Sequence, residues 1–365
     1  MINAKERLFS LDLLRGLDMF LLRAVGPVVY ACNSVWHYPE GFMREFNHPW
    51  GGFTLWDIIM PLFIFMCGAA VPLALPKRME NGRARRKYWM HVAGRVALLW
   101  FLGLICQGNL LTLDASKLAL FTNTLQAIAA GYVVAAVAQT VRVEKVRRAL
   151  PFALVAVYAL LLAFCGDYSQ TGNFAYVFEL KLETALPFIG NTLGGHYTWF
   201  LTSLMFGAMT LFGAQATEIL TSERPQWTKA GFLAGYGAAL LAVGWALVPV
   251  IPMIKQIFTA SFTLQAVGWS MLAYAALYVL TDIWKLRRGL GLFILYGQCA
   301  LMVYMLGGVF ADSVLAAAKV LTQGLPHLFG GETYMPIAVK VVYVILLTTV
   351  VWFYRRAKAA GKRAS

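Results

Sequence analysis

The residues best suited to chemistry lie in one stretch of the sequence, from Asn47 to Gly68. His48 precedes an apolar run, and the carboxylate of Asp57 stands near the start of that run. A neutral imidazole can act as a nucleophile or as a general base. A carboxylate beside it can fix its tautomer and stabilise positive charge on the ring. The pattern therefore makes His48 and Asp57 the candidate catalytic residues.

The environment of Asp57 is predicted to be a membrane span. No charged residue follows it until Lys77, which leaves an apolar segment long enough to cross a bilayer. An ionisable residue that enters such a span must be solvated by protein, water or a partner. This requirement strengthens the functional interpretation of Asp57.

The composition predicts an all-α, polytopic membrane helix bundle. Hydrophobic residues make up 60% of the 365 residues, charged residues only 13%, and the mean hydropathy is +0.65. We expect about ten spans (ten to eleven) in a single transmembrane domain over residues 1–365, and no removable signal peptide. The expected spans are Leu11–Val35, Phe53–Leu75, Val92–Gln107, Leu118–Val141, Leu150–Cys165, Trp199–Phe212, Gly231–Ile251, one beginning near Met253, Gly291–Ala311 and Pro336–Tyr354.

The charge pattern favours a bilayer as the partner and excludes nucleic acid. The net charge is +14, but Lys and Arg fall mainly in alternate short loops, as the positive-inside rule predicts. The segment Gly166–Tyr197 is nearly neutral, so we expect it outside. We therefore predict an inner (cytoplasmic) membrane protein with both termini in the cytoplasm. The five cysteines show no metal-ligand spacing, and we expect no metal and no disulfide.

The stretch around His48 resembles a known family. The residues that carry the resemblance are His48, Trp50, Gly52, Phe53, Thr54, Asp57, Pro61, Phe63, Phe65 and Gly68. Together they resemble the transmembrane acyltransferases related to heparan-α-glucosaminide N-acetyltransferase. Two positions depart from that pattern: the histidine sits one residue nearer the tryptophan, and Gly26 stands where relatives often have asparagine.

The opening of the first span carries a second part of the resemblance. Asp12, Arg15 and Gly16 match the D-x-x-R-G signature of these acyltransferases. The resemblance implies that Arg15, with Asp12, holds a phosphate of coenzyme A, a task suited to a forked guanidinium. The alternative is a structural ion-pair ladder, since Asp12, Arg15 and Asp18 share one helical face.

Four further residues are candidates for binding. Asn123 and Gln126 lie in FTNTLQAIAAGY, which is similar to the family's L-Q-R-I-A-x-x-Y, although Ala127 replaces the arginine. They either tie helices together or contribute to coenzyme A binding. Trp50 and Lys255 are candidate substrate-binding residues. Lys255 keeps a family motif and either orients the histidine loop or extends to the membrane interface.

The resemblance implies an acetyl-CoA-dependent acetyltransferase. Acetyl-CoA would be the co-substrate, the acceptor would be an amino sugar or glycan with a terminal glucosamine on the extracytoplasmic side, and a homodimer is possible. Two alternatives stay open. One is an O-acyltransferase of exported glycans, and the other is a proton- or ion-coupled transporter whose relay uses the charged residues of the spans. These residues are Asp12, Arg15, Asp18, Arg23 and Asp57.

Overall fold

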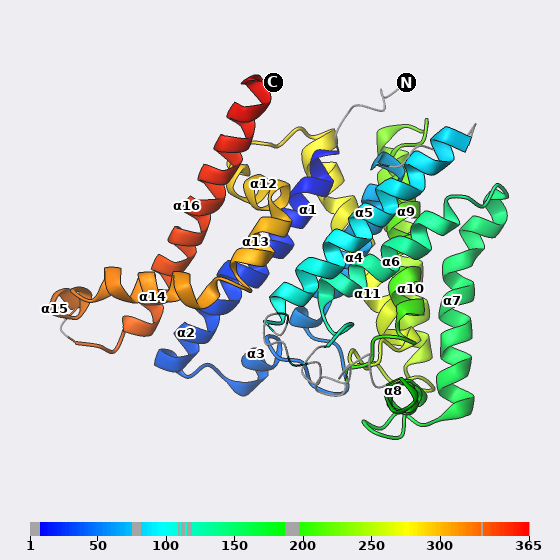
Figure 1. Cartoon of the computed structure of the whole chain (residues 1–365), viewed down its shortest axis with the longest axis horizontal. Coiled ribbons are helices and arrows are strands. Elements are labelled where there is room, and N and C mark those ends of the chain that lie inside the picture. Colours follow the sequence, from blue (N-terminus) through cyan, green and yellow to red (C-terminus); the bar gives the residue numbers. More distant parts are fainter. Residues whose placement is uncertain are drawn as a thin grey trace. The chain divides into compact units, whose positions relative to one another are not determined.

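The computed structural model describes residues 8–74, 82–108, 110, 114, 119–186, 197–329 and 331–364. Every regular element in these ranges is a helix, which confirms the all-helical fold (Figure 1). The elements are α1 (Phe9–Phe20), the π-helix η1 (Leu21–Val25), α2 (Gly26–Trp36), α3 (Glu40–Arg44), the 3₁₀-helix η2 (Leu55–Ile58), α4 (Ile59–Ala74), α5 (Gly82–Cys106), α6 (Thr124–Ala138), α7 (Glu144–Cys165), α8 (Phe174–Ala185), α9 (Ser203–Leu220), α10 (Gln226–Leu247), α11 (Ala260–Tyr278), the π-helix η5 (Val279–Ile283), α12 (Gly291–Gln298), α13 (Ala300–Leu306), α14 (Ala311–Thr322), α15 (Leu325–Phe329) and α16 (Met335–Ala364).

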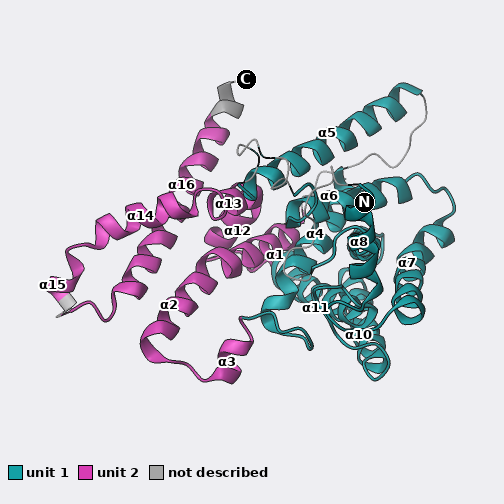
Figure 2. Cartoon of the chain, turned by 60° about the horizontal axis from the view of Figure 1, so that its bottom comes forward, with its two compact units in different colours: residues 1–7, 47–284 teal, residues 8–46, 285–365 magenta. Residues whose placement is uncertain are grey.

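The helices gather into two compact units (Figure 2). Unit 1 contains Asn47–Trp284 and therefore η2, α4 to α11 and η5. Unit 2 joins the two ends of the sequence, Leu8–Phe46 and the residues from Lys285 onward. The single transmembrane domain expected from the sequence stays a prediction.

The number of apolar helices is smaller than the sequence suggested. Among the described residues, seven helices are long and apolar enough to cross a membrane, and eight if the bent pair α13–α14 forms one span. The expectation of about ten spans is therefore not met. Two helices that lie in expected spans are not among those counted. Helix α6 has only 15 residues, and α9 has polar side chains, Gln215 and Glu218, within its 18 residues.

The predicted continuous span Gly291–Ala311 is wrong. Helices α12 and α13 separate at Cys299, whose backbone leaves the helical region (φ −114°, ψ 22°), and α13 and α14 meet at 71°. Glycine favours such breaks because it gains little from helical conformation. Gly297 lies in the last turn of α12, and Gly307 directly follows α13. A hydropathy pattern registers the apolar content of this stretch but not its broken backbone.

The basic segment before the expected third span is also helical. Helix α5 begins at Gly82, ten residues before the predicted start at Val92, and includes Arg83, Arg85 and Arg86. Arginine and lysine have high helix propensity, and no proline interrupts the segment. Lys77 and Arg78 lie outside the described residues.

Unit 1 is held together by helices that approach closely at glycines. A methyl group at Gly68 of α4 would overlap the carbonyl oxygen of Thr210 in α9, and one at Gly213 of α9 would overlap the carbonyl oxygen of Phe65 in α4. Small residues of this kind let apolar helices pack backbone against backbone. Gly68, the last residue of the acyltransferase-like stretch, thus has a structural role.

Unit 2 uses the same device between α1 and α12. A methyl group at Gly16 would overlap the carbonyl oxygen of Phe293, and one at Gly297 would overlap that of Asp12. The π-helix η1 presents Arg23, whose guanidinium donates to the carbonyl oxygens of Gly307 (2.6 Å) and Tyr304 (3.2 Å). Helices α2 and α14 pack against α16.

We predict that Gly68→Ala lowers the stability of the purified protein by about 1–3 kcal/mol, because the added methyl group has no space at the α4–α9 contact. Thermal unfolding followed by circular dichroism in detergent measures the effect. Gly235→Ala in α10 is the matched control, since nothing lies within 4 Å of the added methyl group there. Equal melting temperatures for the two variants would contradict the role given to Gly68.

Candidate functional site

His48 and Asp57 are in direct contact. His48 Nδ1 lies 2.7 Å from Asp57 Oδ1. The Asp57 side chain is fully buried, whereas 37% of the His48 side chain is exposed. A carboxylate can only accept hydrogen bonds, so we assign the proton to Nδ1. This tautomer leaves the lone pair on Nε2 available to a substrate.

The 3₁₀-helix η2 holds Asp57 in place. Asp57 Oδ2 accepts a hydrogen bond from the backbone N–H of Thr54 (3.1 Å). The Thr54 hydroxyl donates to the carbonyl oxygen of Asn47, next to His48, at 2.9 Å. Thr54 and Asp57 form a capping box, which begins η2 and holds Oδ2, so that Oδ1 is directed to His48. The same few residues therefore start the helix and orient the imidazole.

Lys255 completes the cluster from a distant part of the sequence. Its Nζ lies 3.0 Å from His48 Nδ1, 3.2 Å from His48 Nε2 and 3.4 Å from Asp57 Oδ1. The nearly equal distances to both ring nitrogens place Nζ over the imidazole rather than in line with one lone pair. Only 4% of the Lys255 side chain is exposed, so the interpretation that it extends to the membrane interface is wrong.

Burial also changes the acidity of Lys255. Desolvation lowers the pKa of its ammonium group from 10.5 to about 8, and the nearby Asp57 carboxylate opposes that shift. A lysine of this kind is charged at neutral pH yet can lose its proton at moderately alkaline pH. It can donate a hydrogen bond to a developing negative charge.

Backbone contacts fix the lysine loop against the histidine loop. The Gly52 N–H donates to the Met253 carbonyl oxygen (2.9 Å), and Gln256 Nε2 donates to the carbonyl oxygens of His48 and Pro49 (both 3.3 Å). Thr259 Oγ1 and Ser261 Oγ both donate to the Pro252 carbonyl oxygen, which closes the turn that carries Lys255.

Two aromatic side chains, Trp50 and Tyr197, are connected with the cluster. Trp50 Nε1 donates to the carbonyl oxygen of Tyr168 (3.2 Å), which ties the histidine loop to the segment after α7. The Tyr197 and Trp199 rings stack with centroids 6.0 Å apart. Burial raises the pKa of the Tyr197 hydroxyl, and the negative charge of Asp57 raises it further. Tyr197 thus lies within electrostatic reach of the Asp57 carboxylate and keeps its proton as a hydrogen-bond donor.

The other predicted residues have different surroundings. Asn123 caps α6, and its Oδ1 accepts from the Leu125 N–H (2.9 Å), while Gln126 Oε1 accepts from the N–H groups of Thr122 and Asn123. Both side chains therefore shape a helix start. Gln126 Nε2 is buried and has no hydrogen-bond partner among the described residues.

Asp12 and Arg15 belong to α1 of unit 2, where Asp12 is 5% exposed. The carboxylate of Asp18 on the same helix is buried, and neither of its oxygens has a hydrogen-bond partner among the described residues. Within that part of the chain, no ion-pair ladder includes Asp18. Coenzyme A binding by Asp12 and Arg15 stays a prediction.

Comparison with known proteins gives a family and a distant relative. A family described as a domain of unknown function (DUF5009) matches residues 7–203, which is more than half of the chain. The chain belongs to this family. Heparan-alpha-glucosaminide N-acetyltransferase from Homo sapiens is 26% identical over 99 residues, which are 27% of this chain and 13% of the relative. The match supports a distant relationship to an N-acetyltransferase over a small part of that protein.

Sequence reasoning missed two residues that support the site of this DUF5009 member. Gln256 braces the histidine loop, as described above. The buried carboxylate of Glu179 in α8 accepts hydrogen bonds from the N–H groups of Trp199 and Phe200, the latter at 2.7 Å. The Thr198 N–H in turn donates to the Gln256 carbonyl oxygen (3.2 Å). No local pattern around Glu179 predicts these long-range contacts.

Thr54 illustrates a signal that was present in the sequence. Thr54-x-x-Asp57 is a capping-box pattern directly before an apolar run. Asn123-x-x-Gln126 is a second such pattern, in which asparagine is the N-cap and glutamine is the third helical residue. Such a pattern predicts that the carboxylate faces back toward the helix start. That direction is where His48 lies.

We predict that Glu179 makes stability fall with rising pH. Burial raises the pKa of its carboxyl group from 4.5 to about 8, so the folded state binds more protons than the unfolded state between these pH values. Stability therefore decreases as the pH rises through this window, by about 1.4 kcal/mol for each pKa unit of the shift that is realised. Thermal unfolding between pH 5 and pH 8 should show the slope.

Glu179→Gln should flatten this dependence, because glutamine stays neutral and its oxygen can accept the same two N–H groups. Glu223→Gln in the loop after α9 is the control, since that side chain is exposed. A slope that is unchanged in Glu179→Gln would assign the effect to another group.

Proposed function

We propose that this protein is a membrane-embedded acetyltransferase that moves an acetyl group from cytosolic acetyl-CoA to an amino sugar on the extracytoplasmic side. The observation that carries the proposal is the exposed imidazole of His48, held by the buried Asp57 and flanked by the buried Lys255. The distant similarity to an N-acetyltransferase supports the same reaction class. Arg15 is proposed to bind a coenzyme A phosphate, with Asp12 beside it in the coenzyme A site, and Trp50 to contact the sugar.

Two routes fit the His48 geometry. In the covalent route, Nε2 attacks the thioester carbonyl carbon, the C–S bond breaks and coenzyme A leaves as a thiolate. The amine then attacks the acetyl-imidazole, the Nε2–C bond breaks, and the freed Nε2 takes the amine proton. In the direct route, Nε2 takes the proton from the amine while the amine nitrogen attacks the thioester and the thiolate leaves. Asp57 stabilises the cationic ring in either route, and the Lys255 ammonium donates to the carbonyl oxygen as it becomes negative.

Helix α7 supports the assignment of sides. Lys145, Arg147 and Arg148 lie in its first turns, whereas Tyr168, which accepts the Trp50 hydrogen bond, follows its last residue. A helix of 22 residues spans about 33 Å, the thickness of a bilayer core. The basic residues and the His48 site therefore lie at opposite ends of α7. If the basic end is cytoplasmic, the site is extracytoplasmic.

A transporter is the second candidate, and the unpaired buried Asp18 favours it. A carboxylate without partners in an apolar helix is typical of proton-coupled carriers. Release of coenzyme A that depends on an amino sugar distinguishes the acetyltransferase from a carrier. Comparison of amino sugars with matched neutral sugars in the same assay separates N-acetylation from O-acetylation.

His48→Ala should reduce acetyl transfer by about 10²–10⁴-fold, because the variant lacks the base or nucleophile. Asp57→Asn should reduce the rate of acetyl transfer less than His48→Ala does if the carboxylate only orients and stabilises the ring. Coenzyme A release with glucosamine as acceptor measures both effects, and His91→Ala is the control, because His91 is exposed on α5. Labelled acetyl-CoA without acceptor gives a base-labile adduct on His48 in the covalent route and none in the direct route. Full activity of His48→Ala would refute the proposal.

Lys255 should produce the alkaline limb of the pH profile. The ammonium form is the donor, and its pKa is about 8, so kcat/KM should fall as the pH rises through that value. Lys255→Met should lower kcat/KM about 10²-fold at neutral pH. Arginine stays charged, so the remaining kcat/KM of Lys255→Arg should not fall above about pH 8. An alkaline limb that is the same in Lys255→Arg would show that a different group titrates.

Single cysteines in a background without the five native cysteines should establish the sides. We expect an impermeant thiol reagent to label position 170 in intact cells, and positions 87 and 145 only after the membrane is opened. Gln170, Lys87 and Lys145 are exposed, whereas Asn173 is a buried helix cap and is unsuitable for labelling. Labelling at position 87 in intact cells would reverse the orientation.

A further inference from the structure

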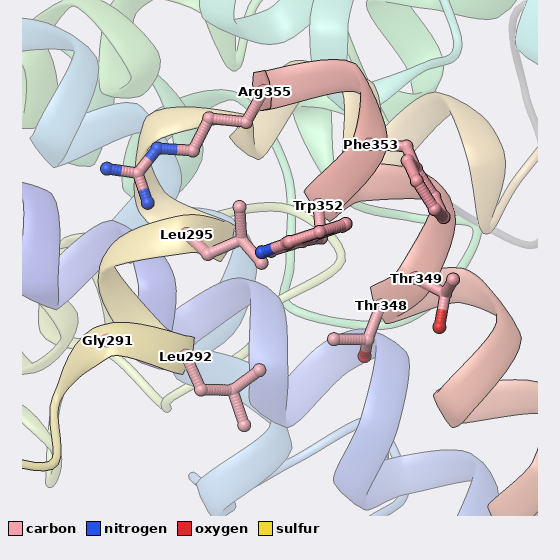
Figure 3. A pocket seen from close by; sticks show the side chains of 8 residues that line it. All are labelled: Gly291, Leu292, Leu295, Thr348, Thr349, Trp352, Phe353 and Arg355. Carbon is pink, nitrogen blue, oxygen red and sulfur yellow. The ribbon is translucent and has the colours of Figure 1, made fainter. Parts of the chain in front are cut away.

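Unit 2 contains a groove between α12 and α16 with a volume of about 640 Å³ (Figure 3). Most of its wall is apolar, and one charged side chain, Arg355, stands at its edge. The lining residues are Gly291, Leu292, Leu295, Thr348, Thr349, Trp352, Phe353 and Arg355.

The wall of the groove suits a hydrocarbon chain. Leu292, Trp352 and Phe353 are 38%, 43% and 60% exposed, and the last two lie on a helix that is long and apolar enough to cross a membrane. The hydroxyls of the lining threonines already have partners within the protein, and the Thr348 hydroxyl also bonds the Tyr296 hydroxyl of α12 (2.7 Å). Thr348 Oγ1 donates to the Val344 carbonyl oxygen (2.7 Å), and Thr349 Oγ1 donates to that of Ile345 (2.8 Å). The groove thus offers no strong polar partner along its wall.

Arg355 differs from its basic neighbours on α16. The Arg356 guanidinium lies over the Trp352 ring (4.8 Å), and the Lys358 ammonium lies near the Tyr354 ring (5.9 Å). Within the described part of the chain, Arg355 pairs with no carboxylate and lies over no ring. It stands where the apolar stretch of α16 ends and the basic terminal segment begins, which is the position of a lipid headgroup at a membrane surface.

We propose that this groove binds one anionic phospholipid, with an acyl chain between α12 and α16 and the headgroup phosphate on Arg355. A guanidinium fork matches phosphate oxygens, and the apolar wall excludes water around the chain. This site is independent of acetyl transfer, because none of its residues belongs to the His48 cluster. Phosphatidylglycerol, which carries one negatively charged phosphate diester and two acyl chains, is the probe lipid.

Native mass spectrometry of the full chain in detergent tests the proposal. Phosphatidylglycerol and phosphatidylcholine with identical acyl chains are titrated onto the wild type, Arg355→Gln and Lys358→Gln. The last variant removes one positive charge from the same helix outside the groove. We expect one tightly retained phosphatidylglycerol, with affinity about tenfold lower in Arg355→Gln and nearly unchanged in Lys358→Gln. Equal retention of the two lipids, or equal losses in the two variants, would overturn the site.

Two further measurements place the ligand. Leu292→Trp fills the groove at a partly exposed position, and it should lower retention of phosphatidylglycerol while the melting temperature stays unchanged. Phosphatidylglycerol with brominated chains should quench less fluorescence in Trp352→Phe than in the wild type. Displacement of the lipid by equimolar glycerol 3-phosphate or coenzyme A would instead identify a site for soluble phosphates and refute the lipid assignment. Unchanged retention in Leu292→Trp or unchanged quenching would place the lipid elsewhere.

Discussion

Burial of the Asp57 carboxylate is the constraint on which unit 1 depends. A charge without solvent is strongly destabilising unless hydrogen bonds and opposite charges replace the water. Asp57 meets this requirement with a backbone N–H of its own helix turn, the imidazole of His48 and the ammonium of Lys255. The same contacts that make the buried charge tolerable also orient the ring. Structural necessity and the proposed chemistry therefore rest on one set of atoms.

The position of Lys255 depends on a second layer of contacts. The lysine loop is anchored by Gln256 to the histidine loop and by Tyr158, whose hydroxyl donates to the Ile257 carbonyl oxygen (2.5 Å). Glu179 holds the adjoining segment through the N–H groups of Trp199 and Phe200. The buried Glu179 is thus connected to the loop of the proposed catalytic lysine through the segment that contains Thr198. Its ionisation is expected to affect stability through this segment.

Glycines determine how closely the helices can pack. Gly68 and Gly213 bring α4 and α9 together in unit 1, and Gly16 and Gly297 do the same for α1 and α12 in unit 2. Apolar helices gain no hydrophobic free energy by leaving lipid for one another, so close backbone contact contributes much of their association. Gly16 and Gly68 stand within the acyltransferase-like motifs. Some residues of those motifs are therefore explained by helix packing rather than by chemistry.

The sequence by itself determined the all-helical class, the apolar spans around the candidate site and the pairing of His48 with Asp57. These features are local, because composition, helix-length apolar runs and a capping box depend on residues close together in the chain. Only the tertiary structure brought Lys255 onto the imidazole, linked Glu179 to its loop and divided Gly291–Ala311 into two helices. Those outcomes depend on contacts between residues far apart in sequence and on backbone geometry at glycines. Hydropathy and spacing carry no information about either.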